Sequence, residues 1–585
     1  MDKKTIIAVV LAVFVIIGSM IIQSVFFPTK EIPPAAETAE AEPEAATEIW
    51  TEAEEAPSIA LSSERLLTAK EEDLKEESFI LETEVYQVTL SNRGGIITSI
   101  QLKEFVNRDG TPLEMVLSKE SGRYPFSIHF GDMNSPAVDE LFHYQQALVG
   151  NKVEFSREFQ SPAGVPFTLQ KTYLFKPNDY LIELSITIEN SVNDFPALDY
   201  NGIAYTLGFG PQIGPDFKKL DRRHEYRQYL YFSDGKKKNI KVPKEGISVL
   251  EERVTWAAII GKYFEVIVIP DATQYRITYD TQPISGLHEQ SSFYFSRPVI
   301  RSYKNTDIFR FYVGPKKRDI LLRYNDPNRN EFKIGNMHFE ETVASSVLIG
   351  WLANILKFFL ELFYRVIPNY GVAIILLTIL IKVLLFPLTR KSYESTGKMQ
   401  SLQPKINELR ERLKGNPQQL NKEMAALYKR ERVNPMGGCL PMLLQLPIFF
   451  ALYNLLSNHF ELRGAAFLPP WIVDLSAPES VWDFSAFVPN GVPFVGWQDL
   501  RLLPFIMVVT TFLQSRLTQA PGSSNKQMKM MTYMMPIMFF FILYDMPSGL
   551  VLYWTMQNFI SVFQQLLINE RRRRKGGRES SGEGK

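Results

Sequence analysis

One lysine stands inside an otherwise apolar stretch of the chain. Lys382 lies within residues 370–389 (YGVAIILLTILIKVLLFPLT), a segment long enough to cross a bilayer. A cation at membrane depth costs about 3 kcal/mol or more on insertion scales, so an intramembrane charge is a functional hypothesis by default. The chemistry that Lys382 offers is electrostatic, namely the attraction of a negative or polar group into the membrane.

Polar side chains recur in the later apolar segments. They are Gln445, Thr510, Thr511, Gln514, Thr532, Tyr533, Gln557, Asn558 and Ser561. Taken singly, each is best interpreted as a hydrogen bond between helices, worth about 1 kcal/mol. Taken together with Lys382, they indicate a water-containing cavity inside a helical bundle.

The sequence leaves three environments open for Lys382. No intramembrane Asp or Glu is evident as its partner, so the ammonium must be hydrated, attract a negative ligand, or reach lipid phosphates by snorkelling. Lys382 lies about 10 Å before Thr389 along a helix. Helical side chains tilt toward the amino end, here the outer side, which argues against snorkelling toward the cytoplasm.

Motifs for cofactor, metal or nucleotide chemistry are missing from the sequence. The single cysteine, Cys439, allows no disulfide within the chain, and the six histidines form no cluster. Gly261-Lys262 and Gly397-Lys398 lack the spacing of a phosphate-binding loop. We therefore predict no cofactor, no metal and no catalytic residue, and we do not expect the chain to be an enzyme.

The amino-terminal part of the chain is predicted to be a membrane anchor followed by a linker. Residues 1–28 carry an apolar core longer than that of a cleaved signal peptide, which favours an uncleaved signal anchor. Lys3 and Lys4 place its amino terminus in the cytoplasm. Residues 29–78 are an acidic linker rich in Pro, Ala and Glu, which cannot bury enough apolar surface to fold alone.

Residues 79–335 show the alternation of β-strands. Leu184, Ile186 and Ile188 alternate with polar residues, and Asn92-Arg93-Gly94-Gly95 is typical of a hairpin turn. Many short strands of this kind predict a large antiparallel β-sandwich. The preceding linker places this domain outside the cytoplasm.

Residues 341–364 form an amphipathic segment that carries Lys357 and Glu361 in its interior. If the segment spanned the membrane, the basic stretch that follows the next span would lie outside, against the positive-inside rule. We therefore predict an interfacial amphipathic helix.

Five further segments are predicted to span the membrane, which makes six spanning helices with the anchor. They are residues 370–389, 439–457, 502–516, 530–546 and 550–568. The connection 459–500 is acidic and rich in tryptophan, whereas 517–529 and the tail 571–585 are basic. One orientation satisfies every loop: both termini lie in the cytoplasm and residues 29–340 lie outside.

Between the first two of these spans, residues 390–433 form a basic cytoplasmic stretch with 11 basic and 5 acidic residues. Apolar residues at helical spacing on either side of Gly415-Asn416-Pro417 predict a hairpin of two helices. The basic residues can orient the chain in the membrane and contact lipid headgroups, or they can form a docking surface for a ribosome, a nascent chain or a partner protein. Both roles can hold together.

Three stretches resemble the YidC-type membrane protein insertases of the YidC/Oxa/Alb family, over about residues 340–570. They read FPLTRKSYESTGKMQSLQPKINELRERL, NKEMAALYKRERVNPMGGCLPMLLQLPIFFALYNLL and MPSGLVLYWTMQNFISVFQQLLI. The anchor and sandwich resemble the Gram-negative bacterial form, which implies a periplasmic β-supersandwich domain and a location in the bacterial inner membrane.

The resemblance implies an insertase core, residues 365–570, in which five helices enclose a hydrophilic groove. A basic residue of the first core helix lines that groove, and Lys382 occupies the position where arginine is commoner. The family's substrate slide maps onto parts of 439–457 and 530–546, and Tyr553 and Trp554 match aromatic positions that contact substrate. The expected groove residues are Lys382, Gln445, Thr511, Tyr533, Tyr553, Trp554 and Asn558.

These features predict a polytopic α-helical membrane protein that acts as a membrane protein insertase and chaperone without nucleotide hydrolysis, alone or with the Sec translocon. The expected partners are nascent membrane proteins, the Sec translocon, membrane lipids, and a ribosome or targeting factor at 390–433 and the basic tail. One alternative is a solute or ion transporter that uses Lys382 as an anion site, although neither inverted repeats nor paired broken helices are evident. Another is an enzyme in the sandwich, which would need a converging acid–base pair.

Overall fold

A computed structural model gives the fold of the chain. The structure describes residues 74–107, 110–117, 124–147, 151–161, 164–190, 198–210, 213–215, 225–243, 245–281, 291–343, 350–431, 440–488, 491–493, 495–518 and 526–580. The predicted anchor 1–28 and all but the last residues of the predicted linker 29–78 lie outside the described residues.

The first half of the described chain consists of antiparallel β-sheets. A four-stranded sheet has the order β1 (Ser78–Glu82), β2 (Tyr86–Ser91), β3 (Ile96–Val106), β4 (Pro112–Glu114). A five-stranded sheet has the order β13 (Ile247–Leu250), β16 (Arg276–Asp280), β17 (Ser292–Ile300), β10 (Leu198–Phe209), β5 (Ser127–His129). A nine-stranded sheet has the order β12 (Lys236–Ile240), β11 (Gln228–Ser233), β14 (Trp256–Ile260), β15 (Phe264–Ile269), β18 (Lys304–Pro315), β9 (Leu181–Asn190), β8 (Pro166–Phe175), β7 (Lys152–Gln160), β6 (His143–Gln146).

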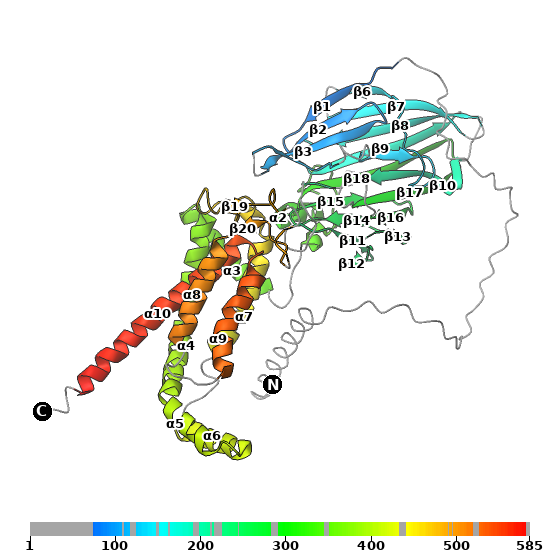
Figure 1. Ribbon diagram of the computed structural model, residues 1–585. Coiled ribbons are helices and arrows are strands. Elements are labelled where there is room, and N and C mark those ends of the chain that lie inside the picture. Colours follow the sequence, from blue (N-terminus) through cyan, green and yellow to red (C-terminus); the bar gives the residue numbers. More distant parts are fainter. Residues whose placement is uncertain are drawn as a thin grey trace, which may run out of the picture. The chain divides into compact units, whose positions relative to one another are not determined.

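Aromatic side chains join the two smaller sheets to the nine-stranded sheet. Phe79 of β1 stacks on Phe155 of β7, and β1–β3 lie over β7–β9 in Figure 1. Phe209 of the five-stranded sheet stacks on Phe311 of β18. Phe126 lies edge-on to Phe209 and Phe311 within the same core. Since the strands alternate buried and half-exposed residues, the sequence pattern of period two is explained by burial of one sheet face.

The second half of the described chain is helical. Short turns come first: α2 (Arg318–Leu321), η1 (Leu322–Asn325) and η2 (Phe339–Thr342). The long helices are α3 (Gly350–Val366), α4 (Tyr370–Ser401), α5 (Gln403–Arg412), α6 (Pro417–Arg430), α7 (Leu440–Asn458), α8 (Leu503–Thr518), α9 (Lys526–Leu543) and α10 (Ser548–Ser580). A turn η4 (Phe460–Leu462) and a strand pair, β19 (Trp482–Asp483) and β20 (Asp499–Leu500), lie between α7 and α8.

Several helix boundaries differ from the predicted ones. Helix α4 includes Pro387 and continues twelve residues past the expected end of the span at 389, through the basic residues that follow, to Ser401. The first part of the predicted hairpin 390–433 therefore belongs to α4. Helix α10 continues twelve residues past the expected end of its span at 568, to Ser580. The predicted interfacial helix 341–364 is also shifted, since α3 begins at Gly350 and residues 341–342 belong to η2.

Helices α5 and α6 form the predicted two-helix hairpin. Asn416 caps α6 by accepting a hydrogen bond from the Gln419 amide at 3.1 Å, and Pro417 occupies the first turn, where no backbone donor is needed. Leu402, Ile406 and Leu427 form a small buried core between the helices. The apolar stripes recognised in the sequence therefore meet.

Glu265 is a fully buried carboxyl in strand β15 of the sandwich. Its Oε1 atom lies 3.1 Å from Thr342 Oγ, which is also 2.8 Å from the Phe339 carbonyl oxygen. The Thr342 hydroxyl donates toward both oxygen atoms, and its bond to Glu265 favours the ionised carboxylate. Burial raises the pKa of Glu265 from 4.5 to about 8, although the Lys316 charge and the hydrogen bond to Thr342 oppose the shift.

Glu265→Gln should remove a pH dependence of stability. The folded carboxyl keeps its proton up to about pH 8, whereas the unfolded one loses it near pH 4.5, so the free energy of unfolding falls as pH rises between these values. Between pH 6 and pH 9 the unmodified chain should lose roughly 3 kcal/mol more stability than Glu265→Gln. Thermal unfolding of the full chain in detergent, followed by tryptophan fluorescence, measures this.

The matched control is Glu189→Gln, because Glu189 is a half-exposed carboxylate of the same sheet, paired with Lys304. This variant should keep the pH dependence of the unmodified chain. If the free energy of unfolding of Glu265→Gln depended on pH in the same way as that of the unmodified chain, the raised pKa of the buried carboxyl would be contradicted.

Candidate functional site

Lys382 of α4 points at α10. The side chain is only 8% exposed, and its Nζ atom donates a hydrogen bond of 2.6 Å to Ser561 Oγ. Ser561 Oγ in turn donates to the Gln557 carbonyl oxygen one turn earlier at 2.8 Å. Among the described residues, no acidic group lies within ion-pair distance of Lys382.

The helices bring these two residues to the same depth. Lys382 lies about 18 Å along α4 from Tyr370, and Ser561 about 20 Å along α10 from Ser548. If the helices begin at the outer edge of a hydrocarbon layer about 30 Å thick, both residues lie near the middle of that layer. A lysine that bonds to a neighbouring helix at this depth is turned into the bundle.

A second polar contact links α10 to α8. Asn558 Nδ2 donates to Thr511 Oγ at 2.6 Å, and Thr511 Oγ donates to the Met507 carbonyl oxygen at 2.7 Å. Both side chains are buried. Asn558 and Ser561 are three residues apart and therefore share one face of α10. We call Lys382, Thr511, Gln557, Asn558 and Ser561 the polar cluster.

Hydrogen-bonding groups around the polar cluster are shielded from solvent yet have no partner among the described atoms. They are Gln557 Oε1, Gln564 Oε1 and Trp554 Nε1. The Lys382 ammonium also has three protons and a single described acceptor. Buried polar groups of this kind are normally satisfied by water or by a ligand. The arrangement can therefore hold water or polar groups of another chain.

The remaining predicted groove residues are spread over different surfaces. Tyr553 is fully buried, whereas the ring of Trp554 lies between Phe449 of α7 and Phe539 of α9, with centroids 5.1 and 5.0 Å away. Gln445 of α7 is half-buried. Tyr533 is 55% exposed on α9, away from the buried polar groups, and its ring contacts Phe512 of α8.

A charged cluster at the start of α8 and the end of α9 was not predicted from the sequence. Buried Arg501 donates to the Asp545 carboxylate and, at 2.8 Å, to the Tyr544 carbonyl oxygen. Its guanidinium lies 5.0 Å from the centroid of the Tyr544 ring, on which Trp497 stacks at 3.8 Å. These contacts fasten the connection 459–500 to the turn between α9 and α10.

The same connection holds the first turn of α4. Asn369 Oδ1 accepts from the Val372 amide at 3.1 Å, and Asn369 Nδ2 donates to the Phe467 carbonyl oxygen at 3.2 Å. The Phe467 ring lies directly on Gly371, where any Cβ would overlap it. Glycine at 371 therefore lets the connection 459–500 approach the helix that carries Lys382.

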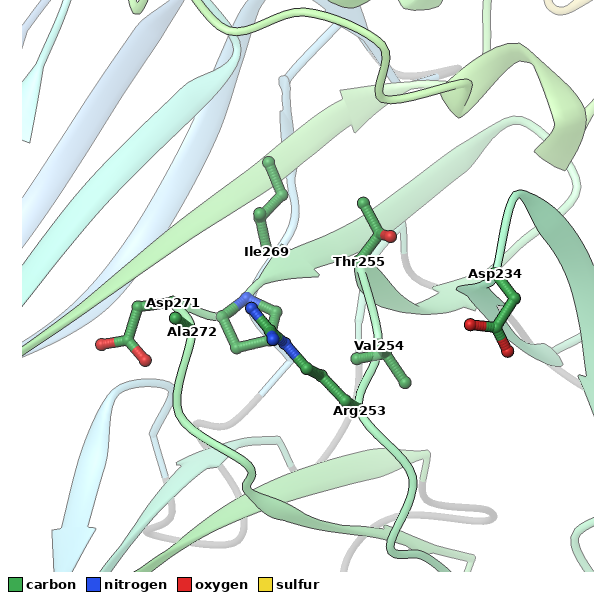
Figure 2. Close-up of a pocket in the computed structure, with 8 residues that line it drawn as sticks. Asp234, Arg253, Val254, Thr255, Ile269, Asp271 and Ala272 are labelled. Carbon is green, nitrogen blue, oxygen red and sulfur yellow. The ribbon is translucent and has the colours of Figure 1, made fainter.

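The sandwich contains an open pocket, lined by Asp234, Arg253, Val254, Thr255, Ile269, Pro270, Asp271 and Ala272. Figure 2 shows Asp234 and Asp271 on opposite sides of it, so these two carboxylates do not converge. Asp271 accepts from the Thr273 and Ile308 amides at 2.8 and 3.0 Å, which gives it a structural role. The pocket therefore offers no acid–base pair formed by its two carboxylates.

Within the part of the chain that the structure describes, no group of three or more His, Cys, Asp or Glu side chains could hold a metal ion.

A helical bundle with a buried cation, joined in sequence to a large β-sandwich, defines a class of membrane protein with a β-rich extracytoplasmic domain. Residues 362–575 match the family model described as 60Kd inner membrane protein, and residues 79–361 match that of the YidC periplasmic domain. The chain belongs to the YidC family of membrane protein insertases, which are inner-membrane proteins.

Curated relatives cover nearly the whole chain. The membrane protein insertase YidC of Treponema denticola is 37% identical over 97% of this chain and 99% of its own length. That of Treponema pallidum is 35% identical, with the same coverage of both chains.

Two solved structures are similar to parts of the chain. An active YidC insertase crystal structure with the first transmembrane domain resolved covers 85% of this chain and 93% of its own, at 18% identity and a TM-score of 0.34. A galactose mutarotase-like protein from Lactobacillus casei covers 41% and 100%, at 11% identity and a TM-score of 0.29. Similarities this low carry no argument about function.

One of the described helices is long and apolar enough to cross a membrane by length and hydropathy alone. It comprises Tyr370–Arg390, which contains Lys382. Leu503–Leu517 of α8 is a shorter apolar helix. Lys382 thus lies in the segment with the clearest bilayer-spanning character in the described part of the chain.

Gly371→Ala should destabilise the helical core. The added methyl group would overlap the Phe467 ring and force the connection 459–500 away from α4, a form of overpacking that costs about 1–3 kcal/mol. Thermal unfolding of the purified chain measures the loss. Gly350→Ala is the control, because a Cβ at this first residue of α3 meets no atom within 4 Å, and its effect should be near zero. Equal melting temperatures for the two variants would contradict the packing of Phe467 on α4.

Proposed function

We propose that this chain inserts nascent proteins into the bacterial inner membrane and assists their folding, without nucleotide hydrolysis, alone or with the Sec translocon. The observation that carries the proposal is the buried Lys382 ammonium, held toward α10 by Ser561 with no described acidic partner. A cation placed in this way attracts the polar or acidic outer segment of a substrate into the membrane.

The polar cluster forms the wall of a hydrophilic groove under this proposal. Gln557 and Gln564 offer oxygen atoms that the described chain leaves unpartnered, so water or a substrate backbone can bond to them. The cost of moving a polar segment across the hydrocarbon layer falls when these groups replace bulk water.

The apolar part of a substrate would slide along the exposed surface of α9 and the adjoining part of α7. Tyr533, Ile537 and Phe541 recur at helical spacing on α9 and are exposed. Trp554 lies behind this surface, between Phe449 and Phe539. Transfer of the substrate helix into lipid, at about 25 cal/mol per Å² of apolar area, then drives its release.

Helix α3 is proposed to lie in the membrane interface. Leu356 and Leu360 are buried in the core that α3 shares with α4 and α7, while Trp351, Phe358 and Val366 are exposed. Lys357 and Glu361 form an ion pair of 3.5 Å on this helix. An apolar outer face with charged residues beside it is typical of a helix lying along the lipid surface.

The remaining assignments complete the topology. The six spans, with both termini in the cytoplasm and residues 29–340 in the periplasm, follow the distribution of loop charges. Helices α5 and α6, with the basic tail, would then face the cytoplasm, where a ribosome or targeting factor could bind. Their basic surface also suits anionic lipid headgroups.

Removing the charge at position 382 should impair insertion selectively. Lys382→Gln should reduce insertion of a single-span substrate with an acidic outer segment about tenfold, and Lys382→Glu should reduce it further, because the groove would repel the acid. Lys382→Arg keeps the charge and should retain most of the activity. Protease protection of the substrate after reconstitution of each variant in liposomes measures insertion.

Lys357→Gln is the matched control, because it removes a lysine charge from the half-exposed surface of α3. It should insert the same substrate normally. Normal insertion by Lys382→Glu would refute the electrostatic role. Solute flux through the liposomes without insertion would favour the alternative, a solute or ion transporter.

A further inference from the structure

The connection between α7 and α8 carries an exposed apolar hairpin. Trp482 is 57% exposed and Phe487 is 77% exposed, and Val481 beside them is exposed as well. The Trp482 ring contacts both Phe484 and Phe487, with centroids 5.9 and 6.4 Å away, so the aromatic residues form one surface. We call residues 481–487, with the paired strand β20, the aromatic hairpin.

The strand pair of this hairpin has two chemically different faces. Trp482 lies opposite Leu500, and Asp483 lies opposite Asp499. Successive residues of a strand point to opposite faces, so the apolar pair occupies one face and the acidic pair the other. Asp499 accepts a hydrogen bond of 2.7 Å from Ser480 Oγ on the acidic side. The hairpin is therefore amphipathic.

The apolar face of the hairpin is continuous with the outer surface of α8. Leu500 is followed by Leu502, and exposed apolar residues then recur at Phe505, Val509 and Leu513. Their spacing of three and four residues places them on one side of the helix. Figure 1 shows β19 and β20 at the end of α8 where that helix begins.

The hairpin is held in place by buried contacts. Arg501, one residue after β20, bonds to the carboxylate of Asp545 and to the Tyr544 carbonyl oxygen. Tyr544 Oη donates to the Asp499 carbonyl oxygen at 2.8 Å. The Val481 amide donates to the Leu500 carbonyl oxygen at 2.9 Å. These bonds fix the orientation of the apolar face relative to α8.

We propose that the aromatic hairpin inserts its Trp482 and Phe487 side chains into the outer leaflet of the membrane, at the boundary between headgroups and acyl chains. The occupant of this surface is lipid, because the same apolar stripe continues along α8, which the proposed function places in the bilayer. Tryptophan is enriched at that boundary, since its ring is apolar and its N–H group can bond to water or headgroups. The acidic pair lies on the opposite face, where Asp499 pairs with buried Arg501 at 3.6 Å.

This anchor would set the height of the connection 459–500 above the membrane. That connection holds the first turn of α4 through Phe467 and the outer ends of α8 and α9 through Arg501. An interfacial hairpin therefore fixes the depth at which the polar cluster lies. The inference rests on the proposed function in one respect, the assignment of α8 as a spanning helix.

Depth measurements with spin labels test the proposal on the full chain in liposomes. Cys439→Ser removes the only cysteine, and Phe487→Cys then carries a nitroxide at a site whose side chain packs little. Val509→Cys on α8 is the bilayer reference, and Asp234→Cys on a sandwich turn is the aqueous reference. The readout is the ratio of collision with oxygen, which enters lipid, to collision with a water-soluble nickel chelate.

The label at 487 should give a ratio several-fold above that at 234 and below that at 509. Adding Trp482→Ser should shift it toward the aqueous value. A ratio equal to that at 234 would overturn the proposal, and protection from both reagents would do so by showing that protein, such as a second copy, covers the hairpin. An aqueous ratio at 509 would instead overturn the span assigned to α8, and the two failures are thus distinguishable.

Discussion

Burying one positive charge costs free energy, and the packing of the helical half of this protein must offset that cost. Among the described helices, the one that contains Lys382 is long and apolar enough to cross a bilayer, yet its ammonium is turned toward α10. Such a placement is tolerated only where polar groups replace the lost hydration. Ser561 of the facing helix supplies one such group, and Gln557 and Asn558 lie buried on the same helix. The helix packing must hold these groups together for the charge to remain inside.

The connection 459–500 provides that constraint. It packs Phe467 on Gly371 at the start of α4, and it uses Arg501 to join α8 to the turn that leads into α10. Ser548 Oγ, at the start of α10, donates to the Asp474 carbonyl oxygen of the same connection at 2.8 Å. One segment thus fixes the first turns of α4, α8 and α10, the helices that bear the polar cluster. The aromatic hairpin extends from this segment.

Periodicity and charge predicted much of this arrangement, because both are local properties of the sequence. The apolar stripes containing Ile406 and Leu427 predicted the α5–α6 hairpin, and its two helices meet at these residues. The alternation around Leu184 predicted strands of the sandwich in the same way. Lys382 was recognised because one charge stands out in an apolar segment.

Other features depend on tertiary contacts that no local pattern encodes. Arg501 and Asp545 are 44 residues apart, and only the fold pairs them. The rotation of α9 leaves Tyr533 on an exposed face, although its polarity suggested a groove residue. Helix α4 continues past 389 because its polar residues Arg390–Ser401 are compatible with helix, whereas hydropathy marks only where apolar composition ends. The partner of Lys382 is a serine, and the sequence pattern of charged residues does not reveal such a partner.

Photocrosslinking from inside and outside the bundle tests most directly whether the polar cluster receives a substrate. A photoreactive residue replaces either buried Asn558 or exposed Tyr533, with Lys382 left intact, and stalled nascent chains are presented to each variant. The account predicts that 558 crosslinks to the polar outer segment of the substrate and 533 to its apolar helix. Crosslinks from 533 alone, with none from 558 to any substrate, would contradict a groove around Lys382.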